Sequence, residues 1–210
     1  MGKRLRDKVA IVTGASRGIG AAIAAHMAEE GAKVVLVSRK IEGLQAVADE
    51  IRGNSGDATP IPCHAGRADQ RQDMLDQALK AYGKVDILVN NAATNPLVNI
   101  ASVVGMMGAP MQGVYAMTKA AVISMTKTLA MELGGVGIRV NAIAPGLIET
   151  KFAEVLVGNE EFRKMIVDRT AAGRVGQPRD IAGGAVFLAS DESDYLTGDV
   201  MTIDGGWTLA

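Results

Sequence analysis

Tyr115 and Lys119 lie four positions apart at the start of a segment with helical periodicity, and Ser102 closes the apolar run before it. Residues four apart share one face of a helix, so the phenol and the amine can reach the same substrate. A hydride transferred to a carbonyl leaves an alkoxide that needs a proton, which a Tyr supplies when a neighbouring cation lowers its pKa. The Ser102 hydroxyl can polarise the carbonyl oxygen. Ser102, Tyr115 and Lys119 are therefore candidate catalytic residues for carbonyl chemistry.

The same spacing occurs on ordinary helices, so this hypothesis depends on a cofactor motif elsewhere in the chain. A strand, a Gly-rich turn, an Ala-rich helix and a second strand follow one another in VAIVTGASRGIGAAIAAHMAEEGAKVVLVSR. The glycines let the turn tighten and let the backbone approach a pyrophosphate at the helix N-terminus. In this complete context a nucleotide site is favoured over a tight turn without a ligand. The candidate contacts in the turn are Gly14, Ser16, Arg17, Gly18, Ile19 and Gly20.

The second strand of this unit ends in Ser38 and Arg39, and no carboxylate follows until Glu42. An NAD site usually holds the adenosine ribose with an acidic residue, whereas an NADP site places an Arg near the 2′-phosphate. Arg17 offers a second cation, and Arg binds phosphate in bidentate geometry. We therefore predict NADP(H) rather than NAD(H), with Ser38 and Arg39 as contacts. The alternative is that Arg39 is a solvated loop residue.

Length and composition are those of an ordinary globular protein. With 210 residues we expect a single domain over residues 1–210. The formal net charge of −1 lacks the excess of basic residues that is typical of nucleic-acid-binding proteins. Cys63 is the one cysteine of the sequence, which excludes an intrachain disulfide. No apolar run is long enough to span a membrane. We expect a cytoplasmic protein with a small-molecule substrate, no metal site, and no nucleic-acid or membrane partner.

Short Val/Ile-rich runs alternate with longer helical segments, which predicts an α/β fold with a doubly wound parallel sheet, the Rossmann fold. Because the runs are almost wholly apolar, the strands should be buried on both faces. Strands are expected over residues 8–13, 33–37, 59–64, 85–90, 97–102, 138–144 and 200–204, and helices over 20–30, 41–52, 70–82, 114–133 and 178–189.

One junction conflicts with this pattern. Only Thr94, Asn95 and Pro96 separate the fourth run, which ends near Ala93, from the fifth, which begins near Leu97. Two parallel strands need a crossover of a dozen or more residues, usually a helix. Either the fold departs from the wound sheet here, or a helical segment that belongs between Pro96 and Leu97 is absent from the sequence. We favour the second interpretation.

Taken together, the motifs resemble those of the short-chain dehydrogenase/reductase family. The matching stretches follow the family order over nearly the whole chain, and those at 63–66 and 90–96 are most similar to NADP-dependent carbonyl and retinal reductases. The stretches are TGASRGIG at 13–20, NNAA at 90–93, NIAS ending at Ser102, YAMTK at 115–119, RVNAIAPG at 139–146 and DGG at 204–206.

The resemblance implies a role for each candidate residue. Tyr115 would be the general acid and base, Lys119 would lower its pKa and bind the nicotinamide ribose, and Ser102 would orient the substrate carbonyl. His64 stands where the family often has an acidic residue against the adenine, so that contact would fall to the backbone of Ala65 or be lost. The further cofactor contacts implied are Asn90, Ala92, Pro145, Gly146, Ile148 and Thr150.

The activity implied is that of an oxidoreductase, a ketone or aldehyde reductase using NADP(H), with 3-oxoacyl-carrier-protein reductase as the alternative. Members of the family carry a long helix between the NNAA strand and the serine strand. That helix bears a catalytic Asn and contributes to a dimer interface, and no residue here can be assigned the Asn role. If the chain truly lacks the helix, the alternative is a catalytically inactive nucleotide-binding protein. Residues 151–174 do not reveal the substrate.

The expected helix over 114–133 is apolar around much of its circumference, so we expect it to be buried on more than one side. The sheet and a partner subunit, in a homodimer or homotetramer, would cover it, or else the absent helix would. Methionines flank the catalytic residues at positions 106, 107, 111 and 117. They would either line a substrate pocket or fill the core.

Overall fold

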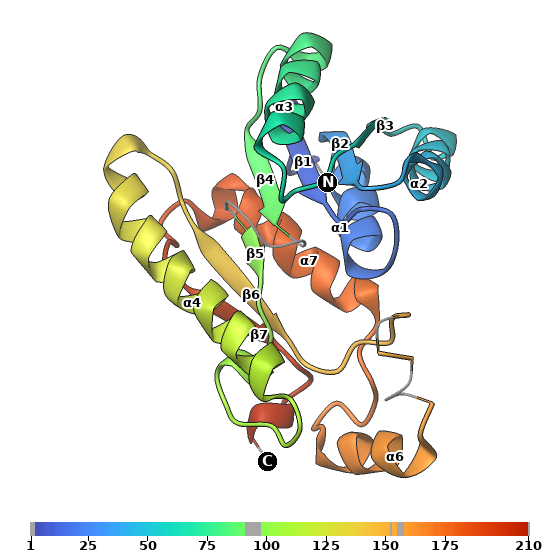
Figure 1. Ribbon diagram of the computed structural model, residues 1–210, viewed down its shortest axis with the longest axis vertical. Coiled ribbons are helices and arrows are strands. Elements are labelled where there is room, and N and C mark those ends of the chain that lie inside the picture. Colours follow the sequence, from blue (N-terminus) through green and yellow to red (C-terminus); the bar gives the residue numbers. More distant parts are fainter. Residues whose placement is uncertain (1–2, 91–97, 152, 155–157, 210) are drawn as a thin grey trace.

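In the part of the chain that the structure describes, seven parallel strands form one sheet in the order β3-β2-β1-β4-β5-β6-β7 (Figure 1). The computed structural model describes residues 3–90, 98–151, 153–154 and 158–209. The strands are β1 (Val9–Thr13), β2 (Lys33–Ser38), β3 (Asp57–Pro62), β4 (Ile87–Asn90), β5 (Val98–Ile100), β6 (Asn141–Pro145) and β7 (Val200–Ile203). The predicted wound parallel sheet is confirmed.

Helices connect these strands, and short 3₁₀ turns occur near their ends. The α-helices are α1 (Gly18–Glu29), α2 (Ile41–Gly53), α3 (Ala68–Tyr82), α4 (Gly113–Leu133), α6 (Glu160–Arg169) and α7 (Pro178–Ala189). The 3₁₀ turns are η1 (Val103–Gly105), η2 (Gly134–Val136), η3 (Asp191–Ser193) and η4 (Trp207–Leu209). No described helix is long and apolar enough to cross a membrane.

The two faces of the sheet have separate cores because successive side chains of a strand point to opposite faces. On β1, Ala10 and Val12 pack in a cluster with buried residues of α1, α2 and α7, whereas Ile11 packs in another cluster with Met74 and Ala78 of α3. All five residues of β1 and of β6 are buried. This double burial explains why the strands read as continuous apolar runs. The helices α3 and α4 cover the face opposite α1 and α7 (Figure 1).

The order of the sheet is unbroken where the sequence appeared to lack a crossover. β4 pairs with β5 in parallel, but only through Val89 with Val98 and Asn90 with Asn99. Seven residues, 91–97, therefore connect strands that overlap by two register pairs. Val98, the first residue of β5, pairs with Val89, which is one residue before the end of β4. The connection therefore has to move back along the strand direction by only about one residue, roughly 3.3 Å. The Pro96–Leu97 junction itself lies outside the described residues.

Helix α4 is far more exposed than its sequence predicted. Of its 21 residues only Thr126 and Ala130 are buried, and large apolar side chains such as Val114, Met117 and Met131 are exposed. The single chain by itself therefore does not bury α4 on more than one side, and cover by a partner subunit or by the absent helix stays a prediction. The sheet covers one side, and no described helix lies between β4 and β5 to cover another.

Helix α6 lies in the segment whose structure we did not predict. Its start has an ordinary signal, because the Asn159 side chain accepts a hydrogen bond from the amide of Phe162, and Glu160 and Glu161 occupy the first turn. An Asn cap followed by acidic residues is a typical helix beginning. The motif was therefore readable from sequence, although it carries no information about a ligand.

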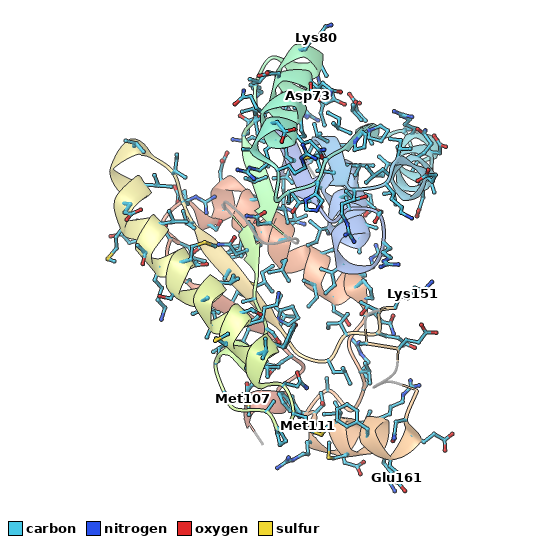
Figure 2. The ribbon with its side chains drawn as sticks, viewed as in Figure 1. Asp73, Lys80, Met107, Met111, Lys151 and Glu161 are labelled. Carbon is cyan, nitrogen blue, oxygen red and sulfur yellow. The ribbon has the colours of Figure 1, made fainter. Side chains whose placement is uncertain are left out.

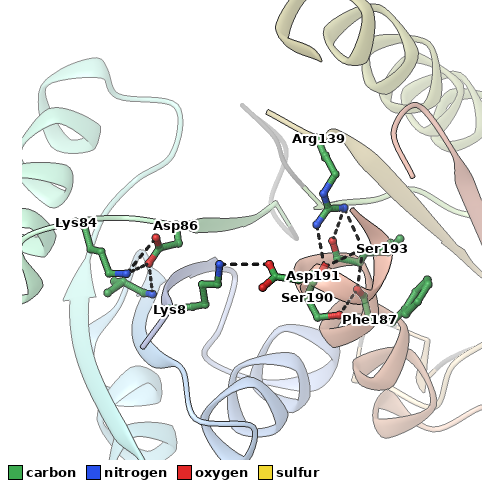
Figure 3. A network of polar contacts seen from close by, with 10 residues as sticks. Lys8, Lys84, Asp86, Arg139, Phe187, Ser190, Asp191 and Ser193 are labelled. Carbon is green, nitrogen blue, oxygen red and sulfur yellow. Dashed lines mark hydrogen bonds and ion pairs between the residues drawn. The ribbon is translucent and has the colours of Figure 1, made fainter. Parts of the chain in front are cut away.

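Arg139 fastens the end of α7 to the start of β6 (Figure 3). Its guanidinium donates to the carbonyl oxygens of Leu188 at 3.1 Å and Ser190 at 3.0 Å, and to the Ser193 hydroxyl at 3.0 Å. The last carbonyls of a helix have no partner within the helix, and a cation satisfies them well. This contact fixes the amino end of β6, at the edge of the sheet opposite the one that carries the residues after β6.

Candidate active site

The Gly-rich turn between β1 and α1 has the backbone conformation that its glycines permit. Gly14 has φ of 63° and Gly18 has φ of 59°, both in the left-handed region that favours glycine. Arg17 is the N-cap residue of α1, and among the described residues no side chain caps this helix end and no acidic residue lies in its first turn. The N-terminus of α1 is therefore suited to an anionic ligand.

The turn meets the segment that follows β6. A Cβ atom on Gly18 would lie 3.6 Å from Cγ2 of Thr150. Pro145 ends β6, Ile148 forms a parallel bridge with Gly176, and a Cβ on Gly146 would lie 2.9 Å from Cα of Asp204. Two groups of predicted cofactor residues, far apart in sequence, are thus neighbours at the carboxyl edge of the sheet, where wound sheets bind nucleotides.

The predicted adenosine residues surround the same edge. A Cβ on Gly43 would lie 3.0 Å from Cβ of Ser16, so the Gly-rich turn contacts the start of α2. Ser38 ends β2, and its hydroxyl donates to the carbonyl of Lys40 at 3.1 Å. Arg17 and Arg39 are exposed, and neither forms an ion pair with a described carboxylate. Both cations are therefore available to a phosphate.

The remaining adenosine candidates end β3 and β4. Asn90 closes β4, and its Oδ1 lies 3.4 Å from the Thr13 hydroxyl beside the Gly-rich turn. The Ala65 carbonyl accepts a hydrogen bond of 2.7 Å from Arg71. His64 is exposed, and its Nδ1 accepts a hydrogen bond from the Gly66 amide at 3.1 Å. Ala92 lies outside the described residues.

Ser102 is buried and caps the 3₁₀ turn η1. Its Oγ accepts a hydrogen bond of 3.3 Å from the Val104 amide, and its carbonyl oxygen accepts one of 3.0 Å from the Gly105 amide. A hydroxyl that accepts from an amide still has its own hydrogen to donate. Ser102 is therefore held in one orientation and can donate to a substrate oxygen.

Lys119 points from α4 toward the strand that carries Ser102. Its Nζ donates a hydrogen bond of 2.9 Å to the carbonyl of Ile100, the last residue of β5. Burial lowers the pKa of Lys119 because desolvation disfavours the charged amine. A half-buried amine with a fixed acceptor is held more rigidly than a surface lysine.

Tyr115 lies one turn before Lys119 on the same face of α4. The Lys119 Nζ is 5.7 Å from the centroid of the Tyr115 ring, and Tyr115 is half-buried. The Tyr115 carbonyl also accepts the Thr118 hydroxyl at 2.7 Å, an ordinary bond within a helix. The structure thus brings Tyr115 and Lys119 together and joins Lys119 to the strand end before Ser102.

The methionines of this region are exposed, so their interpretation as core filler is wrong. Met107 and Met111 lie on the loop leading into α4 (Figure 2), and Met106 and Met117 are exposed as well. The Met106 sulfur accepts a weak hydrogen bond of 3.9 Å from the Thr202 hydroxyl of β7. These methionines are therefore apolar side chains at the surface of the single chain.

Sequence reasoning missed several residues near this edge. An open recess of about 630 Å³ beside Thr150 is lined by Glu149, Thr150, Lys151, Glu154, Gly158 and Arg163. The Gln177 amide donates to Glu149 at 2.6 Å and holds one wall of the recess to α7. Ile100 and Gly105 were also missed, because a backbone acceptor and a close approach leave no signal in residue type.

Two family models match consecutive parts of the chain. One, described as short chain dehydrogenase, matches residues 8–97, and the other, described as enoyl-(acyl carrier protein) reductase, matches residues 96–208. The two matches meet at the junction where the sequence lacks a crossover. Together they extend over almost the whole chain.

Relatives of known name match over similar lengths. The 3-oxoacyl-[acyl-carrier-protein] reductase FabG of Thermotoga maritima is 37% identical, with 98% of this chain and 100% of the relative aligned. That alignment extends over 247 positions, which exceeds the 210 residues of this chain by 37. The relative therefore contains at least 37 residues that have no counterpart here.

Solved structures share the fold closely. A gluconate 5-dehydrogenase from Burkholderia cenocepacia J2315, in complex with NADP and tartrate, is 31% identical with a TM-score of 0.91, over 99% of this chain and 98% of that one. A 7α-hydroxysteroid dehydrogenase complexed with NADH and 7-oxo glycochenodeoxycholic acid is 31% identical with a TM-score of 0.92, over 98% of this chain and 96% of that one.

Proposed function

The chain belongs to the short-chain dehydrogenase/reductase family, and on this basis we propose that it transfers a hydride between NADP(H) and a carbonyl or alcohol substrate. The family consists of NAD(P)-dependent oxidoreductases, and we assign this member to the ketone and aldehyde reductases. The observation that carries the proposal is the cluster at the start of α4, where Lys119 Nζ lies 5.7 Å from the Tyr115 ring and 2.9 Å from the carbonyl of Ile100, two residues before Ser102.

The residues at the carboxyl edge of the sheet fit a dinucleotide. Gly14 and Gly18 have the left-handed backbone of a tight turn, which would let a pyrophosphate approach the start of α1. Ser38, Ala65, Asn90 and Ala92 would hold the adenosine, and Pro145, Gly146, Ile148 and Thr150 would hold the nicotinamide end. When bound, the nicotinamide supplies the hydride for reduction or accepts it for oxidation.

The chain's own side chains handle the proton. In reduction, Ser102 donates a hydrogen bond to the substrate carbonyl oxygen, and Tyr115 passes its phenolic proton to that oxygen as negative charge develops there. The Lys119 ammonium group stabilises the phenolate that remains on Tyr115. In alcohol oxidation the same groups act in the opposite order. General acid catalysis of this kind contributes about 100- to 10,000-fold to the rate.

We propose NADP(H) as the preferred coenzyme. Arg17 and Arg39 are exposed on the side where the 2′-phosphate would lie, and neither is neutralised by a described carboxylate. The Burkholderia structure contains NADP, whereas the hydroxysteroid dehydrogenase structure contains NADH. The coenzyme therefore differs from one similar protein to another. We further propose a cytoplasmic homo-oligomer, a dimer or tetramer, in which a partner covers the exposed apolar side of α4.

Two other functions remain as specific alternatives. A 3-oxoacyl-carrier-protein reductase is supported by the 37% identity to the Thermotoga maritima protein. A catalytically inactive nucleotide-binding protein is supported by the 37 or more positions that this chain lacks relative to that protein. With either function the chain would bind the coenzyme. A 3-oxoacyl-carrier-protein reductase would also turn over an acyl thioester, whereas an inactive nucleotide-binding protein would turn over no substrate.

NADPH oxidation with a panel of ketones, aldehydes and a 3-oxoacyl thioester tests these alternatives. We expect turnover that Tyr115→Phe lowers at least about 100-fold, while NADPH binding measured by fluorescence is retained. Tyr195→Phe is the matched control, since this tyrosine is fully exposed beyond α7. Binding without turnover on every substrate would favour the inactive protein. Inserting the corresponding segment of the Thermotoga maritima relative between Pro96 and Leu97 would then show whether its absence is the cause.

A further inference from the structure

Ser102 and Gly105 are the two ends of one hydrogen-bonded turn. The Gly105 amide donates to the Ser102 carbonyl at 3.0 Å, and the Val104 amide donates to the Ser102 hydroxyl at 3.3 Å. The Met106 amide continues the turn by donating to Val103 at 2.9 Å. A displacement of Gly105 is therefore passed to the Ser102 side chain.

Gly105 packs against the backbone of α4 at the catalytic lysine. A Cβ atom at this position would lie 2.7 Å from the carbonyl carbon of Lys119, 2.8 Å from the amide nitrogen of Ala120 and 2.9 Å from Cβ of Lys119. The φ angle of Gly105 is not in the left-handed region, so space and not backbone conformation requires a glycine here. Carbon atoms pack at about 3.5–4.0 Å, so one methyl group would push the turn away from the helix.

A second tether acts on the same lysine. The Lys119 amine donates to the carbonyl of Ile100, on the strand that leads directly into Ser102. The strand end holds the tip of the lysine, and the turn holds its backbone. We propose that Gly105 is a positioning residue, and that its contact with the Lys119 backbone sets the distance between the Ser102 hydroxyl and the Lys119 amine. This role rests on the proposed function of both side chains.

The experiment is the smallest enlargement of this residue, Gly105→Ala. We expect kcat to fall about 100-fold, because a displacement of about 1 Å between catalytic groups has an effect of that size. The dissociation constant for NADPH should change little, since the Gly-rich turn is untouched. Gly108→Ala and Gly113→Ala are the matched controls, because a Cβ at either position meets no atom within 4 Å. Both should keep the wild-type kcat.

The outcomes separate positioning from folding. Circular dichroism should show Gly105→Ala folded like the wild type at the assay temperature. A variant that unfolds there would overturn the proposal, because the methyl group would then be acting on the fold. A wild-type kcat in Gly105→Ala, or an equal loss in all three alanine variants, would overturn it as well.

A readout without turnover keeps this inference apart from the proposed function. Acetic anhydride labels neutral amines, and the labelling of Lys119 can be followed across pH by peptide mass. Because burial lowers the pKa of Lys119, moving the turn away from α4 should shift its labelling midpoint upward in Gly105→Ala alone. An unchanged midpoint would overturn the positioning role. A wild-type protein that turns over no substrate would contradict the proposed function, while the labelling still decides this question.

Discussion

The side-chain amide of Asn99 donates a buried hydrogen bond of 2.8 Å to the hydroxyl of Thr126, which joins β5 to α4. The same hydroxyl donates to the carbonyl of Val122 at 2.8 Å, so both of its functions are used. Thr126 and Ala130 are the two buried residues of α4. This polar pair is therefore a principal attachment of the helix that carries Tyr115 and Lys119.

Removing both members of this pair should cost less than the sum of the costs of removing each one. Asn99→Leu or Thr126→Val alone leaves a buried polar group without its partner, and each should lower the free energy of unfolding by about 1–3 kcal/mol. The double variant should lose less than the sum of the two. Urea unfolding of the four proteins measures the coupling. Thr128→Val removes the equivalent exposed hydroxyl, bonded to Ser124 at 3.2 Å, and should have little effect. Additive losses would contradict a direct link.

Lys119 should make stability depend on pH in the alkaline range. Burial lowers the pKa of Lys119 from its ordinary 10.5, so the unfolded chain holds this proton more tightly than the folded protein does. Stability then rises with pH through the folded-state pKa and levels off above 10.5. The wild type should therefore gain stability relative to Lys119→Met as pH rises from neutral toward 10.5.

Denaturant unfolding of both proteins over this pH range measures the effect. Lys127→Met is the matched control, because it removes an exposed amine from the same helix. If the stability difference between wild type and Lys119→Met stays constant with pH, the amine is not buried as described.

Arg39 should decide between the two coenzymes. Arg39→Ala is expected to raise KM for NADPH about 10-fold or more, because a hydrogen bond to a charged group contributes about 1.5–3 kcal/mol. KM for NADH should hardly change, since NADH has no 2′-phosphate. Steady-state kinetics with both coenzymes measures the ratio, and Lys80→Ala, an exposed cation on α3 (Figure 2), is the control. An equal change in KM for both coenzymes would show that Arg39 does not contact the 2′-phosphate.

Most of the fold was predictable because its signals are local. Buried parallel strands need apolar residues on both faces, and every end of the predicted strands lies within three residues of the observed end. The helix over 178–189 was predicted with its observed bounds, since Pro178 marks its first turn. Helix α6 was not predicted, although Asn159 and the two glutamates after it are a readable start.

The connection from β4 to β5 and the burial of α4 were harder to predict. Residue type gives the length of a connection, but the overlap of two strands is set by their register, here only Val89 with Val98 and Asn90 with Asn99. The apolar composition of α4 indicates that something covers it. It does not say whether that partner lies in the same chain, and in the single chain most of the helix is exposed.

The sequence by itself determined the wound sheet, the Gly-rich turn and the spacing of Tyr115 and Lys119, because periodicity and backbone freedom are properties of neighbouring residues. Only the tertiary structure decided that Gly18 faces Thr150, that Lys119 is bound to the carbonyl of Ile100, and that Gly105 packs against the backbone of α4. These are approaches between distant segments, and their distances depend on how strands pair and helices pack, which no local pattern encodes.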